Sequence, residues 1–137
     1  MRRALNMNRL RRTLAYAWSA PYTCAGLVLG SIVMAFGGTG HVRSGTLEFA
    51  GGRLGRWVER SACPFGAVTI GHVVLGLDHA LLDRVRAHEQ VHVRQYERWG
   101  LLFIPAYLVA SVLALLRGGH FYKDNPFERE AFTRAGG

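Results

Sequence analysis

Residues 14–36, LAYAWSAPYTCAGLVLGSIVMAF, contain no charged residue. The run exceeds the roughly 20 apolar residues that a helix needs to cross the hydrocarbon core of a bilayer. We therefore expect a transmembrane helix over 14–36, preceded by a basic N-terminal segment over 1–13. A cleaved signal peptide is the alternative, but its apolar part is usually only about 7 to 15 residues long and ends at a small-residue cleavage site, which is missing here.

Charge is the second constraint on what this chain binds. Its net charge is +8, and five arginines precede the apolar run: Arg2, Arg3, Arg9, Arg11 and Arg12. Such a balance suits nucleic acid or an anionic membrane surface, and beside a membrane segment we expect membrane lipids and no nucleic acid. The positive-inside rule would place the N-terminus in the cytoplasm, but residues 41–100 are also rich in arginine, so the side of the membrane stays open. Cys24 lies in the apolar run and Cys63 in a polar loop, and we expect no disulfide between them.

The middle of the chain alternates strand and turn signals. Residues 46–50, TLEFA, and 67–76, AVTIGHVVLG, are rich in β-branched and aromatic residues and are bounded by glycines. Residues 37–41 and 51–55 are glycine-rich and read as turns or loops. These patterns predict a small antiparallel sheet.

A helix is predicted between Asp78, a suitable N-cap, and Gly100, a suitable C-cap. Between them, residues recur at spacings of three and four along one stripe: Leu81, Val85, His88, His92, Gln95 and Trp99. Both histidines of the motif HEQVH therefore share one face of the helix, with Glu89 about 100° further round.

A second apolar segment, 101–116, would be about 24 Å long as a helix, which is marginal for crossing a bilayer. Pro105 near its start and Gly118–Gly119 after its end favour a short helix. Asn125 and Pro126 then indicate the start of a C-terminal helix. Because full crossing would strand this last helix on the far side of the membrane, we expect 101–116 to be a membrane-associated helix that keeps both flanking helices on one side.

The HEQVH motif has the residue types and spacing of a catalytic zinc site. His88 and His92 could ligate one Zn²⁺, while Glu89 could act as general base on a metal-activated water. Downstream candidates for a third ligand are His120, Asp124, Glu128 and Glu130. The alternative is an ordinary amphipathic helix whose histidines face water or a membrane surface.

HEQVH followed, after a hydrophobic segment, by NPFEREA resembles the gluzincin clan of zinc metallopeptidases, in which a later helix supplies a glutamate ligand. It is also similar to small uncharacterised bacterial membrane proteins with HExxHxxQ and NPFEREA motifs. The resemblance implies Glu128 as the third ligand, with Glu130 as the substitute. Phe132 stands where related enzymes place an aspartate that braces a histidine ligand. The resemblance further implies that strand 69–75 forms a rim of the cleft, with His72, His120 or Tyr122 as oxyanion or substrate contacts.

Together these features predict a mainly helical α+β fold: a membrane-anchored, minimal zincin-like domain over 41–137, with a small antiparallel sheet, an HExxH helix, a hydrophobic helix and a C-terminal glutamate-bearing helix. The expected function is a zinc-dependent metallopeptidase of a bacterial inner membrane, acting on proteins or peptides. The competing interpretations are a zinc-binding membrane protein without catalysis, such as a sensor or assembly factor, and a small basic membrane protein without metal.

Overall fold

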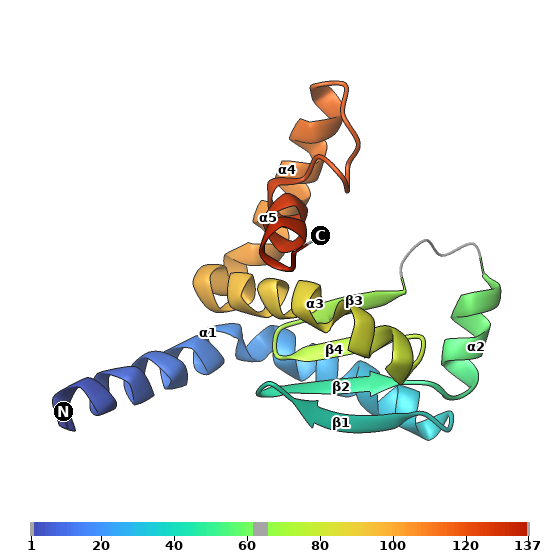
Figure 1. Ribbon diagram of the computed structural model, residues 1–137, viewed down its shortest axis with the longest axis horizontal. Helices are drawn as coiled ribbons and strands as arrows, with labels where there is room; N and C mark the ends of the chain where they lie inside the picture. Colours follow the sequence, from blue (N-terminus) through green and yellow to red (C-terminus); the bar gives the residue numbers. More distant parts are fainter. Residues whose placement is uncertain (1, 62–65, 137) are drawn as a thin grey trace.

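The computed structural model describes residues 2–61 and 66–136, so Cys63, and with it the prediction about a disulfide, lies outside the described residues. The chain is mainly helical with one small sheet, as the sequence predicts (Figure 1). Its elements are α1 (Arg2–Ala35), β1 (Thr39–Arg43), β2 (Thr46–Ala50), α2 (Gly52–Arg60), β3 (Ala67–Ile70), β4 (Val73–Gly76), α3 (His79–Trp99), a 3-10 turn (Gly100–Leu102), α4 (Phe103–Leu116) and α5 (Pro126–Arg134).

The sheet is mixed, which corrects the prediction of an antiparallel one. Its strand order is β1-β2-β4-β3, with antiparallel pairs at both ends and a parallel pair, β2 with β4, in the middle. Helix α2, at the position predicted as a loop, carries the chain from β2 past the position of β4 to the far edge of the sheet, where β3 forms. The chain then turns back as β4, between β3 and β2, and therefore runs parallel to β2. The predicted single strand 67–76 is a hairpin, since Gly71 at φ +63° turns the chain between β3 and β4.

Two helices cover the two faces of the sheet. Gly26 and Gly30 let α1 pack closely on Val73 and Phe49, where any Cβ on either glycine would clash. The two glycines thus form the face of α1 that packs on the sheet. On the opposite face, the α3 residue Leu82 packs on Ala50 and Val74. Strands therefore sit between α1 and α3 (Figure 1).

Helix α3 begins and ends as predicted. The Asp78 carboxylate accepts a hydrogen bond from the Leu81 N–H at 2.7 Å, and Gly100 follows the last turn with a positive φ of +57°. A Cβ at Gly100 would also overlap the Trp18 ring of α1, so glycine is required both by its backbone conformation and by the close approach of α1. These caps fix the register of the motif histidines relative to the sheet.

Helix α4 leaves the body of the protein and the chain returns beside it to form α5 (Figure 1). The Asn125 side chain secures this return, because its amide donates to the Tyr107 carbonyl at 3.1 Å and to the Ser111 hydroxyl at 2.8 Å. Its oxygen accepts from the Phe127 N–H and caps α5, as predicted. Rings of Tyr96, Phe103 and Phe127 pack together where α3, α4 and α5 meet. The hairpin thus brings the C-terminal helix back to α3.

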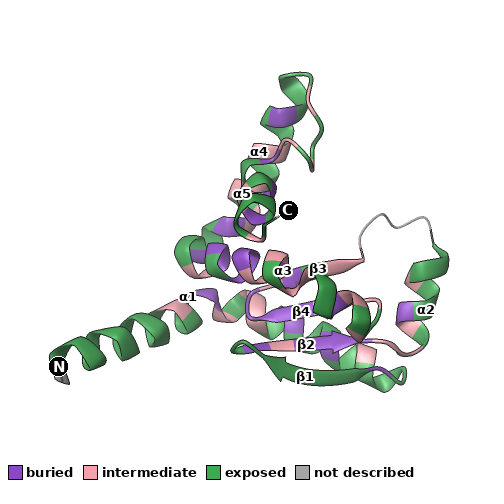
Figure 2. Cartoon of the chain, viewed as in Figure 1, coloured by how far each residue is buried: buried purple, intermediate pink, exposed green. Residues whose placement is uncertain are grey.

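Exposed apolar side chains are concentrated on two helices. Figure 2 shows α1 and α4 largely exposed, while most buried residues lie in the strands and in α3. Two helical stretches of the described chain, Arg3–Ala35 and His79–Leu116, are long and apolar enough to cross a membrane. The second of these is interrupted by the 3-10 turn that separates α3 from α4. The basic segment predicted over 1–13 is not separate from the apolar run: from residue 2 on it forms one continuous helix with 14–35.

Candidate metal centre

Helix α3 presents His88 and His92 on one face, one turn apart, as the stripe predicts. Their Nε2 atoms lie 3.1 Å from each other and their ring centroids 4.9 Å apart. His92 is buried and His88 is partly buried. Both rings therefore direct one nitrogen to a common point on the side of α3 that faces α5.

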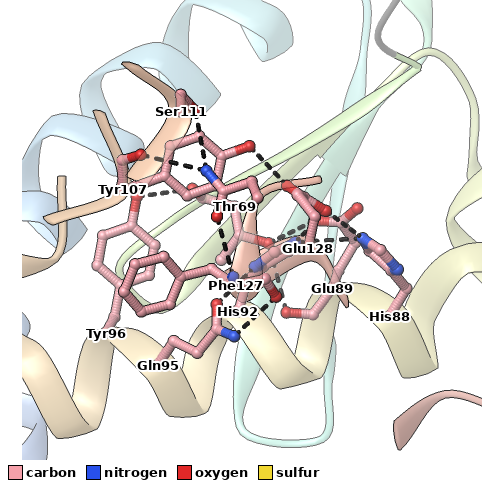
Figure 3. A network of polar contacts seen from close by, with 11 residues as sticks. Thr69, His88, Glu89, His92, Gln95, Tyr96, Tyr107, Ser111, Phe127 and Glu128 are labelled. Atoms are coloured by element: carbon pink, nitrogen blue, oxygen red, sulfur yellow. Dashed lines mark hydrogen bonds and ion pairs between the residues drawn. The ribbon is translucent and has the colours of Figure 1, made fainter. Parts of the chain in front are cut away.

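Glu128, in the first turn of α5, brings a carboxylate to that point. Its Oε2 lies 3.0 Å from His88 Nε2 and 3.2 Å from His92 Nε2. The three atoms form a nearly equilateral triangle (Figure 3). Ligands at about 2.0 to 2.2 Å around a tetrahedral Zn²⁺ are separated by roughly 3.4 Å, so the triangle fits a small divalent cation with little adjustment. The His88–His92–Glu128 cluster could hold a metal ion.

A hydrogen bond at His92 Nδ1 leaves Nε2 as the ring nitrogen that faces His88 and Glu128. Gln95, which is fully buried, donates from its amide nitrogen to the Phe127 carbonyl at 2.9 Å. Since a main-chain carbonyl only accepts, this contact fixes the orientation of the amide and turns its oxygen toward His92 Nδ1, 2.8 Å away. Nδ1 must then carry the proton, and Nε2 is free to bind a metal.

The other oxygen of Glu128 is also held. Oε1 accepts a hydrogen bond from the Tyr107 hydroxyl of α4 at 2.7 Å. Burial raises the pKa of Glu128, but its contacts with the His88 and His92 imidazoles and with the Tyr107 hydroxyl outweigh burial and lower the pKa to about 2. The carboxylate is therefore ionised at neutral pH, the state that a metal ligand needs.

Phe132, at the position where the gluzincins that the motifs resemble carry an aspartate, packs its ring against His88. The two ring centroids are 4.5 Å apart at an angle of 61°. An apolar ring restricts the orientation of His88 but accepts no hydrogen bond from it. The hydrogen bond that orients a histidine of the cluster is instead the one between His92 and Gln95, and both of these residues belong to α3.

Glu89 lies beside the triangle but contributes no atom to it. Its Oε2 accepts a hydrogen bond from the Thr69 hydroxyl of β3 at 2.6 Å, and its side chain is largely buried. The Thr69 carbonyl in turn accepts from the Tyr96 hydroxyl at 2.9 Å. The Glu89 carboxylate is thus held by β3, lines both cavities and stays outside the three ligand positions.

Two cavities meet at this cluster. The larger, about 770 Å³, is lined by β3, by apolar side chains of α1, α2 and α4, and by His88, Glu89, His92 and Glu128. The smaller, about 610 Å³, lies towards the C-terminus and the loop before α5. Both are lined by His88, Glu89 and Tyr122, whereas His92 and Glu128 line the larger cavity and not the smaller one.

The remaining predicted site residues are placed differently. His72 lines neither cavity, and its ring nitrogens contact Ser19 and Glu97. His120 lines only the smaller cavity, and its Nδ1 accepts from the backbone of Tyr122 and Lys123. Tyr122 lines both cavities, and burial raises its pKa to about 12, so the hydroxyl keeps its proton at neutral pH. Glu130 faces away from the cluster and pairs with Arg98 at 2.9 Å.

The sequence prediction missed three residues around the cluster as supports of the site: Gln95, Tyr107 and Thr69. Gln95 carried a usable signal, because position i+3 from His92 on the same helical stripe allows a side-chain contact. Tyr107 had none, since nothing in a hydrophobic segment indicates which hydroxyl will meet a carboxylate from another helix. The divided strand 67–76 places β3 at the cavity and β4 inside the sheet.

No protein-family model, curated protein or solved structure matches this chain. The resemblance to gluzincins and to small bacterial membrane proteins therefore depends on the sequence motifs alone.

Proposed function

We propose that the protein is a membrane-associated, zinc-dependent metallopeptidase with a minimal zincin-like centre. One observation carries the proposal: ligand atoms of His88, His92 and Glu128 converge within 3.0 to 3.2 Å of one another, beside a fourth group, Glu89. Two imidazoles and one carboxylate with an open side are the donor set of a catalytic rather than a structural zinc site.

A zinc ion held by these three groups would supply Lewis acidity, which polarises a scissile carbonyl and lowers the pKa of a coordinated water. The residues of the chain perform the remaining work. Glu89 would take a proton from the attacking water and deliver it to the leaving amine, while Thr69 holds the carboxylate in place. Tyr122 is protonated at neutral pH, lines both cavities and interacts with Glu128, so its hydroxyl lies where it could also donate a hydrogen bond to a substrate.

The shape of the site favours an extended substrate. Two cavities that share His88, Glu89 and Tyr122 would let a chain pass by the centre, whereas a single closed pocket suits a small molecule. Strand β3 borders the larger cavity and is an edge strand, so it could pair with an extended peptide. Most of the larger cavity is apolar, which suits hydrophobic residues of a peptide.

A non-catalytic zinc-binding membrane protein, serving as a sensor or assembly factor, is the second candidate. Its supporting observation is the environment of Glu89, whose oxygen is engaged by Thr69 and whose side chain is largely buried. On this interpretation Glu89 joins β3 to α3 and has no part in chemistry.

The deciding experiment compares wild type with Glu89→Gln, using metal analysis and cleavage of a broad peptide library. We expect the variant to retain zinc and to lose about 10³-fold in cleavage rate, the usual scale for a general base. A chelated wild-type sample controls for contaminating proteases of other classes. Equal cleavage by both proteins, or none by either, would reject the peptidase, and retained zinc would then favour the second candidate.

A further inference from the structure

Beyond the proposed activity, the packing of α1 bears on how the protein meets a membrane. Contacts with the sheet region run along most of the apolar length of α1. The Tyr16 hydroxyl donates to the Gly45 carbonyl at 2.8 Å, and the Phe49 ring of β2 packs directly on Gly30. These two contacts are about 21 Å apart along the helix axis, a large part of the thickness of a hydrocarbon core of about 30 Å.

Strand β1 lies beside the same length of helix, because the chain turns at Gly37–Gly38 and runs back along α1. β1 is an edge strand, all five of its residues are exposed, and they include His41 and Arg43. If α1 crossed the bilayer, this open edge and its charge would lie at the depth of the lipid tails. Open sheet edges do not occur in that region, since unpaired backbone groups find no hydrogen-bond partner among lipid tails.

The face of α1 opposite the sheet has different properties. Residues at seven-residue spacing on this outer face, Ala17, Cys24 and Ser31, are exposed, as is Val28 between them. No charged residue occurs over 14–36, whereas the preceding turns of the same helix expose Arg3, Arg9, Arg11 and Arg12. An uncharged stretch of helix that follows several exposed arginines complements an anionic lipid surface.

We propose that α1 lies in the plane of an anionic membrane surface, with Ala17, Cys24 and Ser31 toward the lipid and the sheet on the water side, and does not cross the bilayer. The arginines contact lipid headgroups. The N-terminus and the candidate metal centre are then on the same side of the membrane. This orientation depends only on the packing of α1, so it holds or fails independently of metal binding and cleavage.

Depth measurements along α1 test the orientation. Spin labels are attached singly to Ala17→Cys, native Cys24 and Ser31→Cys in full-length protein whose other cysteines are changed to Ser, reconstituted in phosphatidylcholine–phosphatidylglycerol vesicles. An in-plane helix gives all three labels the same depth. A crossing helix puts the label at 24 about 10 Å deeper than the other two, since seven residues span that distance. Circular dichroism checks that each labelled protein is folded.

A second measurement uses sidedness. One cysteine is placed in a hydrophilic tag before Met1 and, in a separate protein, another at Glu59→Cys on α2, which lies near the C-terminal end of α1. A membrane-impermeant maleimide should reach both from the same side of sealed vesicles. Labelling from opposite sides, or a deepest label at 24, would overturn the proposal, including the case in which a second copy covers β1 within the lipid.

Discussion

Two histidine clusters in this protein use similar residues for different ends. His72 contacts the Ser19 hydroxyl through Nδ1 at 3.1 Å and the Glu97 carboxylate through Nε2 at 2.8 Å, and its ring stacks on Tyr16. His92 is equally buried, but only its Nδ1 is occupied by a single support, Gln95. Its Nε2 points at the same place as His88 and Glu128.

The difference lies in convergence and access. At His72 each polar atom pairs with a different neighbour, so the cluster ties α1 and α3 to the β3–β4 turn. At His92 three potential metal-ligand atoms converge, and all three residues line the larger cavity. A histidine beside a carboxylate therefore indicates a metal site only when lone pairs from several residues meet, and this contrast can be tested with matched variants.

The largest expected effect is that of metal removal. Zinc at about 1,000 times its Kd should stabilise the folded protein by about 4 kcal/mol, because only the folded chain assembles the three ligands. Thermal unfolding with zinc and with chelator measures this difference. The His88→Ala variant is the control, and an equal response to zinc in that variant would place the metal elsewhere.

The second largest effect is expected when the Glu128 carboxylate is replaced. Glu128→Gln removes the charged ligand and should weaken zinc binding more than 100-fold, beyond the roughly 10- to 100-fold expected for an outer partner. Glu130→Gln, two residues on, should leave the affinity unchanged because its exposed pair with Arg98 is worth at most about 1 kcal/mol. Competition titration with a zinc chelator gives both values, and the reverse ranking would reassign the third ligand.

Gln95→Met should reduce zinc affinity by about 10- to 100-fold, because the His92 tautomer is no longer fixed. Gln90→Met is a matched control on the same helix, since the Gln90 side chain donates its hydrogen bond to the Thr46 hydroxyl and not to a residue of the cluster. Competition titration with a zinc chelator measures the affinity of both variants. Equal affinities for the two variants would show that Gln95 serves packing alone.

The smallest effect is expected at the other cluster. His72→Ala should destabilise the fold by about 1 to 2 kcal/mol through lost hydrogen bonds at Ser19 and Glu97, with zinc affinity unchanged. Chemical denaturation and zinc titration on one sample separate the two quantities. Loss of zinc without loss of stability would contradict the structural role of His72.

Local signals predicted the parts of the structure that depend on neighbouring residues. The stripe and caps of α3 and the Asn125 cap of α5 are set within a few residues, and the sequence predicted all of them. The parallel pairing of β2 with β4 depends on helix α2, whose Gly51–Gly52 start resembles a turn. The contact of Tyr107 with Glu128 depends on the α4 hairpin, which no spacing encodes.

The bond from Gln95 to the Phe127 carbonyl has a consequence for biosynthesis. His92 acquires its metal-binding tautomer from the backbone of the last helix, and Glu128 belongs to that same helix. A nascent chain still lacking α5 would thus have neither the third ligand nor the prepared imidazole. Any metal that binds at the candidate centre would therefore be taken up only after α5 has packed on α3.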